Sequence, residues 1–77
     1  MDFENDIEAL ETAILEVDQR IKKLEVHKDS VNKEIREGKS DNKTVTETLR
    51  RLERNLKELH KKQVFLIKER DSKSLSL

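Results

Sequence analysis

The chain lacks the residues that direct a protein toward a disulfide-linked or sharply bent fold. Its 77 residues include no cysteine, no proline, a single glycine and only two aromatic residues, both phenylalanine. Without cysteine, neither disulfides nor thiolate-based metal or nucleophilic chemistry is available. Without proline, no residue breaks a helix by removing a backbone amide donor. These absences favour an uninterrupted helical chain.

Neither sign of charge predominates, and no long apolar run occurs. Seventeen acidic residues balance seventeen basic ones, and 44% of residues are charged against 32% hydrophobic. No apolar run approaches the ~18 residues that a membrane span needs, and the acidic amino terminus does not resemble a secretory signal. We expect one domain over residues 1–77, located in the cytoplasm and not in a membrane.

Apolar side chains recur at alternating steps of four and three residues in two stretches. The first stretch, which Lys28 interrupts, contains Phe3, Ile7, Leu10, Ile14, Val17, Ile21, Leu24, Val31 and Ile35. The second, which Gln63 interrupts, contains Val45, Leu49, Leu52, Leu56, Leu59 and Leu66. This spacing places each stretch on one stripe of a helix and is typical of a coiled-coil seam.

Helix-ending and helix-starting signals separate the two stretches. Gly38 suits the left-handed position that closes a helix, and Thr44 with Glu47 matches a capping box at the start of the next. The last seven residues lack an apolar stripe, so we expect them to be frayed. The predicted segments are a helix over about 2–37, a loop over 38–43, a helix over about 44–70 and a flexible tail over 71–77.

Both stretches share one register if the chain folds back about residue 40. Residues whose numbers sum to 80 then face each other, so that Ile35 meets Val45 and Ile14 meets Leu66. These pairs combine the two kinds of seam position that antiparallel packing requires. The sequence therefore predicts an all-α, antiparallel two-helix coiled-coil hairpin.

A group of apolar residues near the open end of this hairpin is not used, or not fully used, by the seam. The group comprises Phe3, Leu15, Val64, Phe65 and Ile67. Clustered exposed apolar residues mark interfaces, and a two-helix seam leaves its flanks wet. We therefore expect a protein partner or self-association, for example a four-helix homodimer, with a monomeric hairpin as the alternative. Protein binding through this group is the first functional hypothesis.

The register also brings like charges together beside the seam. Arg20 lies near Lys62, and Glu25 lies near Glu53, so neither contact is attractive. Charges left unsatisfied within one hairpin can be satisfied across a dimer.

A second functional hypothesis comes from the charge distribution. Residues 1–42 contain 12 acids and 7 bases, whereas residues 43–77 contain 5 acids and 10 bases. The outer face of the second helix carries the basic stripe Arg50, Arg54, Lys57, Lys61 and Lys68. Such a stripe could follow the phosphates of single-stranded DNA, although a charged outer face is also ordinary in coiled coils, and helix dipoles favour the same polarity.

Catalytic chemistry has little support in the sequence. His27 and His60 are the only histidines; both fall beside the seam, and the register places His60 near Asp18. The sequence contains neither the H-E-x-x-H pattern of a zinc helix nor a glycine-rich phosphate loop. A two-helix rod also offers no enclosed cavity for catalysis. We expect no enzyme activity, no cofactor, no metal and no small-molecule substrate.

The segments IEALETAILEVD (residues 7–18) and LRRLERNL (residues 49–56) lie on either side of the loop. In helical pattern and size, over nearly its whole length, the chain resembles the small helix-loop-helix accessory proteins of T4-type phages, encoded beside the recombination helicase UvsW. The resemblance implies a non-catalytic accessory protein of phage recombination and replication in the host cytoplasm. It supplies no catalytic residues to transfer, and the chain has none of the ATPase motifs of a helicase.

Overall fold

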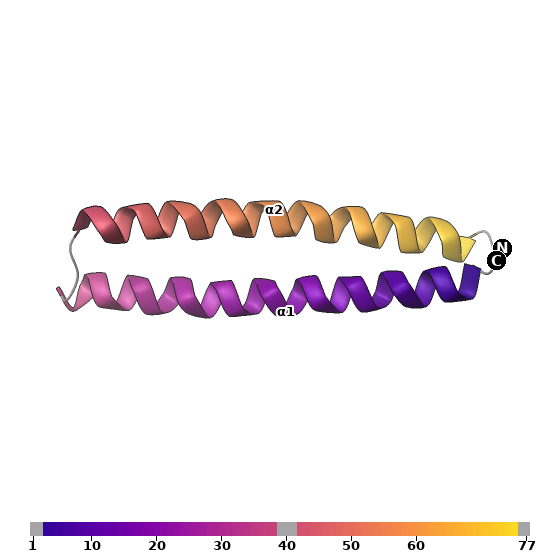
Figure 1. The fold of residues 1–77 in the computed structure, drawn as a ribbon, viewed down its shortest axis with the longest axis horizontal. Helices are drawn as coiled ribbons and strands as arrows, with labels where there is room; N and C mark the ends of the chain where they lie inside the picture. The colour runs from indigo at the N-terminus through magenta and orange to yellow at the C-terminus, as the bar shows by residue number, and fades with distance from the viewer. Residues whose placement is uncertain (1–2, 39–41, 76–77) are drawn as a thin grey trace.

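Two helices of equal length lie antiparallel along one another. In the computed structural model, which describes residues 3–38 and 42–75 and the side chains of 6–38 and 43–75, helix α1 spans Phe3–Arg36 and helix α2 spans Asn42–Leu75. They form a rod with extents of 56 × 14 × 14 Å, in which the start of α1 and the end of α2 share one end (Figure 1). The described residues contain no strand. The predicted all-α hairpin is confirmed.

The core is a single line of side chains between the two helices. Among the side chains described, every buried one belongs to the predicted ladder: Val17, Ile21, Val31, Val45, Leu52, Leu56 and Leu66. They form two clusters, and Leu24 packs against both, so the apolar contact continues along the rod. The ladder residue nearest the loop on α1, Ile35, remains 39% exposed.

Two ion pairs between the helices report the register directly. Lys28 Nζ lies 3.6 Å from Glu53 Oε1, and Lys73 Nζ lies 3.6 Å from Asp6 Oδ2. The residue numbers of these pairs sum to 81 and 79. Because the two pairs are far apart along the rod and both agree with the predicted sum of 80 within one residue, the register is that expected from the sequence.

Helix α1 closes at Gly38 as predicted. Gly38 has a φ of +68°, a left-handed conformation that glycine adopts without steric cost. Its amide donates to the Ile35 carbonyl at 3.1 Å, and the Glu37 amide donates to the Lys33 carbonyl at 3.0 Å. These bonds satisfy carbonyl groups that the helix end would otherwise leave unpaired.

The start of α2 differs from the prediction. The helix begins at Asn42, so Thr44 lies within it and does not act as the capping residue. The Thr44 carbonyl instead accepts a hydrogen bond of 3.0 Å from the Thr48 hydroxyl, one turn later. The expected capping box at Thr44 is therefore wrong, and residues 39–41 of the expected loop lie outside the described residues.

The end of α2 also differs, because the predicted tail is largely helical. The helix extends to Leu75, five residues beyond its expected end at about Arg70, while residues 76–77 lie outside the described part. Arg70 and Lys73 continue the four-three ladder after Leu66, and both are half-buried. Long cationic side chains cover a seam with their methylene stems, and Lys73 also pairs with Asp6. These contacts with α1 explain why the last turns of α2 are helical.

Candidate interaction surfaces

Two shallow grooves flank the seam, one on each side. The first, here called the basic groove, is lined by Arg20, Lys23, Leu24, Asn55, Glu58, Leu59 and Lys62. The second, the mixed-charge groove, is lined by Glu25, Lys28, Asp29, Asn32, Glu53, Leu56, Lys57 and His60. Arg20 precedes a seam residue and Glu25 follows one, which places the two grooves on opposite sides of the seam.

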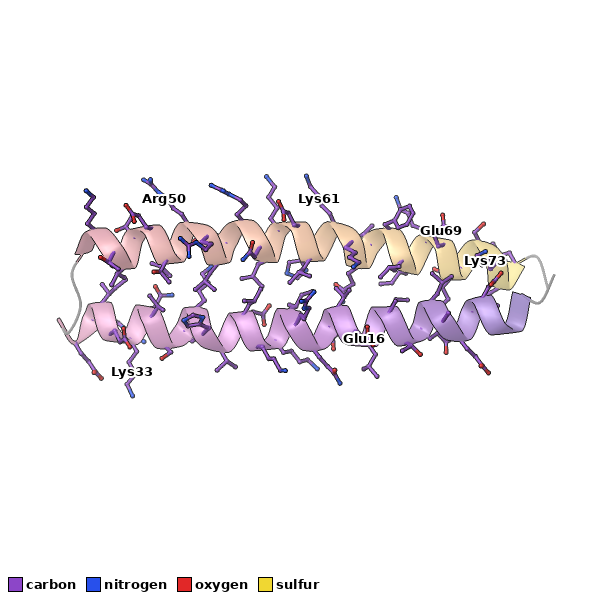
Figure 2. The ribbon with its side chains drawn as sticks, viewed as in Figure 1. Glu16, Lys33, Arg50, Lys61, Glu69 and Lys73 are labelled. Carbon is purple, nitrogen blue, oxygen red and sulfur yellow. The ribbon has the colours of Figure 1, made fainter. Side chains whose placement is uncertain are left out.

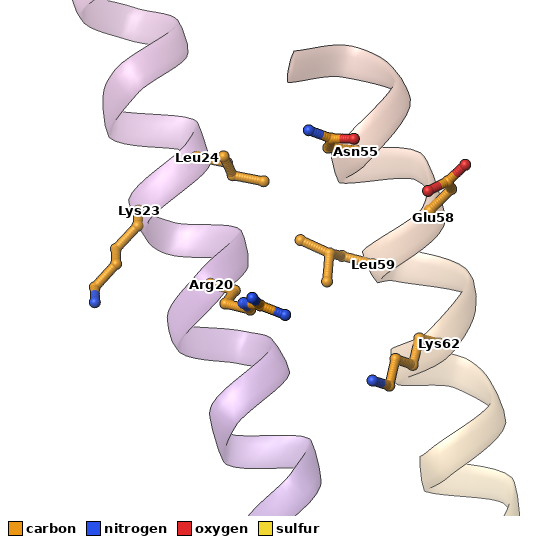
Figure 3. A pocket seen from close by; sticks show the side chains of 7 residues that line it. All are labelled: Arg20, Lys23, Leu24, Asn55, Glu58, Leu59 and Lys62. Carbon is orange, nitrogen blue, oxygen red and sulfur yellow. The ribbon is translucent and has the colours of Figure 1, made fainter. Parts of the chain in front are cut away.

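The basic groove brings cations from both helices together over an apolar floor. Arg20 of α1 and Lys62 of α2 point toward each other across the space between the helices, next to Leu24 and Leu59 (Figure 3). The register predicts this approach of like charges. In the described part of the chain, neither Arg20 nor Lys62 forms an ion pair. Lys23, which the sequence did not indicate, also lines the groove, together with the carboxylate-bearing Glu58.

The mixed-charge groove relieves the predicted repulsion between two carboxylates. Glu25 and Glu53 both line it, as the register predicts. Lys28 lies on the same groove and pairs with Glu53 through a contact of 3.6 Å. The polar interruption of the first ladder therefore has a specific contact with α2.

The histidines take positions that differ in part from the prediction. His60 lines the mixed-charge groove, but Asp18, its expected partner, pairs with Lys22 at 3.1 Å, one turn along α1. His27 lies on the other side of the seam, in a hollow near the loop. Among the described residues, no three histidine or carboxylate side chains converge as metal ligands would.

The apolar residues predicted as an interface are mostly exposed. Leu15 is 57% exposed, Val64 52% and Phe65 62%, while Ile67 is half-buried. The fifth member, Phe3, belongs to α1, but its side chain lies outside the described residues.

Three of these residues share the side of the mixed-charge groove. Residues seven apart occupy the same face of a coiled-coil helix. Leu15 lies fourteen residues before Asp29, and Val64 lies seven residues after Lys57. Ile67 lies seven residues after His60, which also lines that groove. We call Leu15, Val64 and Ile67 the open-end patch.

Phe65 lies on the opposite side of the rod. It follows Glu58, a residue of the basic groove, by seven positions, and it is turned about 100° around the helix from Val64. The single apolar face expected from the sequence is therefore divided between two sides. A count of heptad positions would have revealed the division.

The predicted basic stripe covers two exposed faces of α2. Arg54, Lys61 and Lys68 lie on the outer face, whereas Arg50 and Lys57 lie on the side of the mixed-charge groove. All five members, Arg50, Arg54, Lys57, Lys61 and Lys68, are exposed. Arg50 and Lys61 point away from α1 (Figure 2). None of the five forms an ion pair within the described part of the chain.

Comparison of the chain with known protein families, curated proteins and solved structures found no significant match. Neither described helix carries a stretch apolar enough to cross a membrane. The functional argument therefore rests on the residues of the two grooves, the open-end patch and the basic stripe.

Proposed function

We propose that this chain is a non-catalytic interaction module that binds another protein molecule through the open-end patch. The observation that carries the proposal is the exposure of Leu15 and Val64 on one side of the rod at the same height. Their residue numbers sum to 79, so the two residues lie at the same height on neighbouring helices and project from the same side. Apolar residues exposed singly are ordinary, whereas a group shared by two helices marks a contact surface.

The thin core gives this surface an energetic role. Of the side chains in residues 6–38 and 43–75, seven are buried and none is completely shielded from solvent. Covering a half-exposed Leu15 or Val64 would contribute roughly 1 kcal/mol each. For a rod stabilised by a single seam, a partner at the patch would therefore add to stability as well as to recognition.

The resemblance to phage accessory proteins suggests where to look for the partner. By that resemblance, the partner belongs to the phage recombination and replication proteins in the host cytoplasm. The charged rims of the patch, with Lys22 and Asp18 beside Leu15, favour a partner that carries both signs of charge around an apolar centre.

Capture from a nuclease-treated lysate of phage-infected cells tests the proposal. The bait is the full chain, compared with the double variant Leu15→Glu, Val64→Glu and with the control Val26→Glu. Val26 is 69% exposed and lies about 16 Å along α1 from Leu15. We expect a protein retained by the wild type and the control but lost by the double variant. Equal retention by all three baits would refute the proposal.

The basic stripe supports a second function, the binding of single-stranded DNA. Its first four members recur at steps of four, three and four residues, or about 6, 4.5 and 6 Å of helix, which lets them contact successive phosphates. The absence of acidic partners among the described residues leaves these charges available.

Fluorescence anisotropy with a labelled single strand, measured over a range of salt concentrations, tests this second function. Lys61→Glu should weaken binding and reduce the salt slope by about one contact. The control Lys22→Glu changes an exposed lysine of α1 and should leave binding nearly unchanged. No binding at low salt would eliminate this function while leaving the protein-binding proposal intact.

A further inference from the structure

Phe65 lies on the same side of the rod as the basic groove, and neither the seam nor the open-end patch includes it. Its side chain is 62% exposed. It follows Lys62, a residue of that groove, by three positions, or about 4.5 Å of helix. Proteins that bind single strands combine an aromatic ring, on which a nucleobase stacks, with cations that contact the phosphates. This side of the rod carries both.

The two facing cations of the basic groove, Arg20 and Lys62, are arranged to hold an anionic group between the helices. They point toward each other, whereas the Glu58 carboxylate points away from α1 (Figure 3). Neither cation forms an ion pair with a residue of the described part of the chain. Because like charges repel, an anionic group between the two would be attracted to both and would relieve their repulsion.

The exposure of the groove decides which kind of anion it suits. Its three cations, Arg20, Lys23 and Lys62, are all exposed, and an ion pair in water is weak. A free phosphate ion held by two such contacts would therefore bind poorly. The phosphates of a strand are linked, so that several weak contacts add together and release counterions. The groove therefore suits a polymer with many phosphates better than a small anion.

The positive charge on this side is concentrated around the groove. Between the heights of Phe65 and Arg51, four basic residues and two acidic ones give a balance of +2: Arg20, Lys23, Arg51, Lys62, Glu16 and Glu58. At the edge of this region, Lys62 is followed on the outer face by the neighbouring residue Lys61 of the basic stripe. A strand that leaves the groove at Lys62 can therefore continue onto the stripe.

We propose that the basic groove and Phe65 form a subsite for one nucleotide of single-stranded DNA, with the phosphate between Arg20 and Lys62 and the base stacked on Phe65. By the register, Phe65 lies about 6 Å along the rod from the midpoint between the two cations. The sugar between a phosphate and its base spans such a separation. The inference rests on the second proposed function, and it adds a residue of α1 and an aromatic ring to the DNA contact.

A single fluorescent residue tests the stacked base. The chain contains neither tryptophan nor tyrosine, so Phe65→Trp introduces one reporter and keeps an aromatic ring at the site. Titration with a thymidine oligonucleotide should quench its emission, whereas an abasic strand of the same length should not. The control Val26→Trp, on the outer face of α1, should be quenched by neither strand. Equal quenching by the two strands, or at the two positions, overturns the stacked base.

Two variants of opposite sign test the phosphate contact, with fluorescence anisotropy of a labelled strand as the readout. Arg20→Gln should weaken binding and reduce the salt slope by about 0.7, the value for one contact with a single strand. Glu58→Gln should strengthen binding, because it removes a carboxylate from the groove. The controls Lys33→Gln and Glu11→Gln make the same changes of charge elsewhere on the rod and should have much smaller effects.

Loss of the ring tests the whole subsite. Phe65→Ala should weaken binding at least about fivefold, while circular dichroism shows retained helix because the residue lies outside the seam. Binding that neither Phe65→Ala nor Arg20→Gln changes overturns the inference and leaves the basic stripe as the DNA contact. No binding by the wild type at low salt removes the second function and the inference together. Equally tight binding of poly-glutamate with the same number of charges would assign the groove to acidic polypeptides and overturn the inference.

Discussion

Lys28 and Glu53 join the two helices beside the seam, with Lys28 Nζ 3.6 Å from Glu53 Oε1. Lys28 occupies the step at which the apolar ladder of α1 is interrupted, and its side chain is about one-third exposed. Its methylene stem covers the seam while its ammonium group reaches α2. A partly exposed pair of this kind contributes about 0–1 kcal/mol, which is less than a buried leucine contributes.

Replacing Lys28 by leucine should therefore stabilise the hairpin. We expect Lys28→Leu to raise the free energy of unfolding by about 1 kcal/mol, because it completes the apolar ladder. Urea unfolding followed by circular dichroism measures the change at one fixed protein concentration. Lys61→Leu, at an exposed position of α2, is the control and should have little effect. Destabilisation by Lys28→Leu would show that the ion pair outweighs the apolar gain.

Shortening a side chain in the seam should cost far more than shortening one outside it. Ile21 is 4% exposed and belongs to the larger core cluster, so we expect Ile21→Ala to lose about 2–4 kcal/mol. Val26→Ala, on the outer face, should stay within about 0.5 kcal/mol of the wild type. Thermal unfolding of both variants gives the comparison. Similar losses for the two would contradict the assigned seam.

The left-handed backbone of Gly38 gives a prediction about strain alone. A Cβ atom placed on Gly38 would meet no atom within 4 Å, so a substitution there strains the backbone without creating a clash. We expect Gly38→Ala to lose about 1 kcal/mol of stability and Gly38→Asn to lose less, because asparagine tolerates this conformation better. Urea unfolding should give the order glycine, asparagine, alanine. Equal stability of the three would contradict the positive φ.

The contact between Asp6 and Lys73 can be measured by a double-mutant cycle. Asp6→Ala, Lys73→Ala and the double variant should give a coupling energy of about 0.2–1 kcal/mol, because both side chains are partly exposed. The coupling should fall as salt screens the charges. A coupling of zero at low salt would mean that this pair does not hold the end of α2 against α1.

The seam and its register could be read from the sequence because two independent patterns constrain them. The ladders define the buried stripe of each helix, and Gly38 fixes where the chain turns back. The end of α2 could not be read in this way, because Arg70 and Lys73 occupy ladder positions with cationic side chains. The pattern of apolar residues ends at Leu66. The methylene stems of Arg70 and Lys73 extend the contact between the two helices beyond that point.

The candidate surfaces were predictable in composition but not in arrangement. Exposure of the basic stripe follows from its distance from the seam. The apolar residues were identified as a group, yet neighbouring residues on a helix point about 100° apart, so Val64 and Phe65 serve different sides. Similarly, Asp18 forms an ion pair with Lys22, one turn away on its own helix, and not with His60 of α2. The register shows which residues lie at the same height, but it does not show which of several nearby charged groups a carboxylate will pair with.

The shared position of the two helix ends at one end of a 56 Å rod determines how the protein responds to force. A load that pulls the start of α1 away from the end of α2 separates the seam one layer of side chains at a time. Each separated layer breaks only a few contacts. A load between the loop and the open end instead runs along the backbones of the helices, because the loop joins them, and does not separate the two helices. The seam therefore bears load in the first direction and is bypassed in the second.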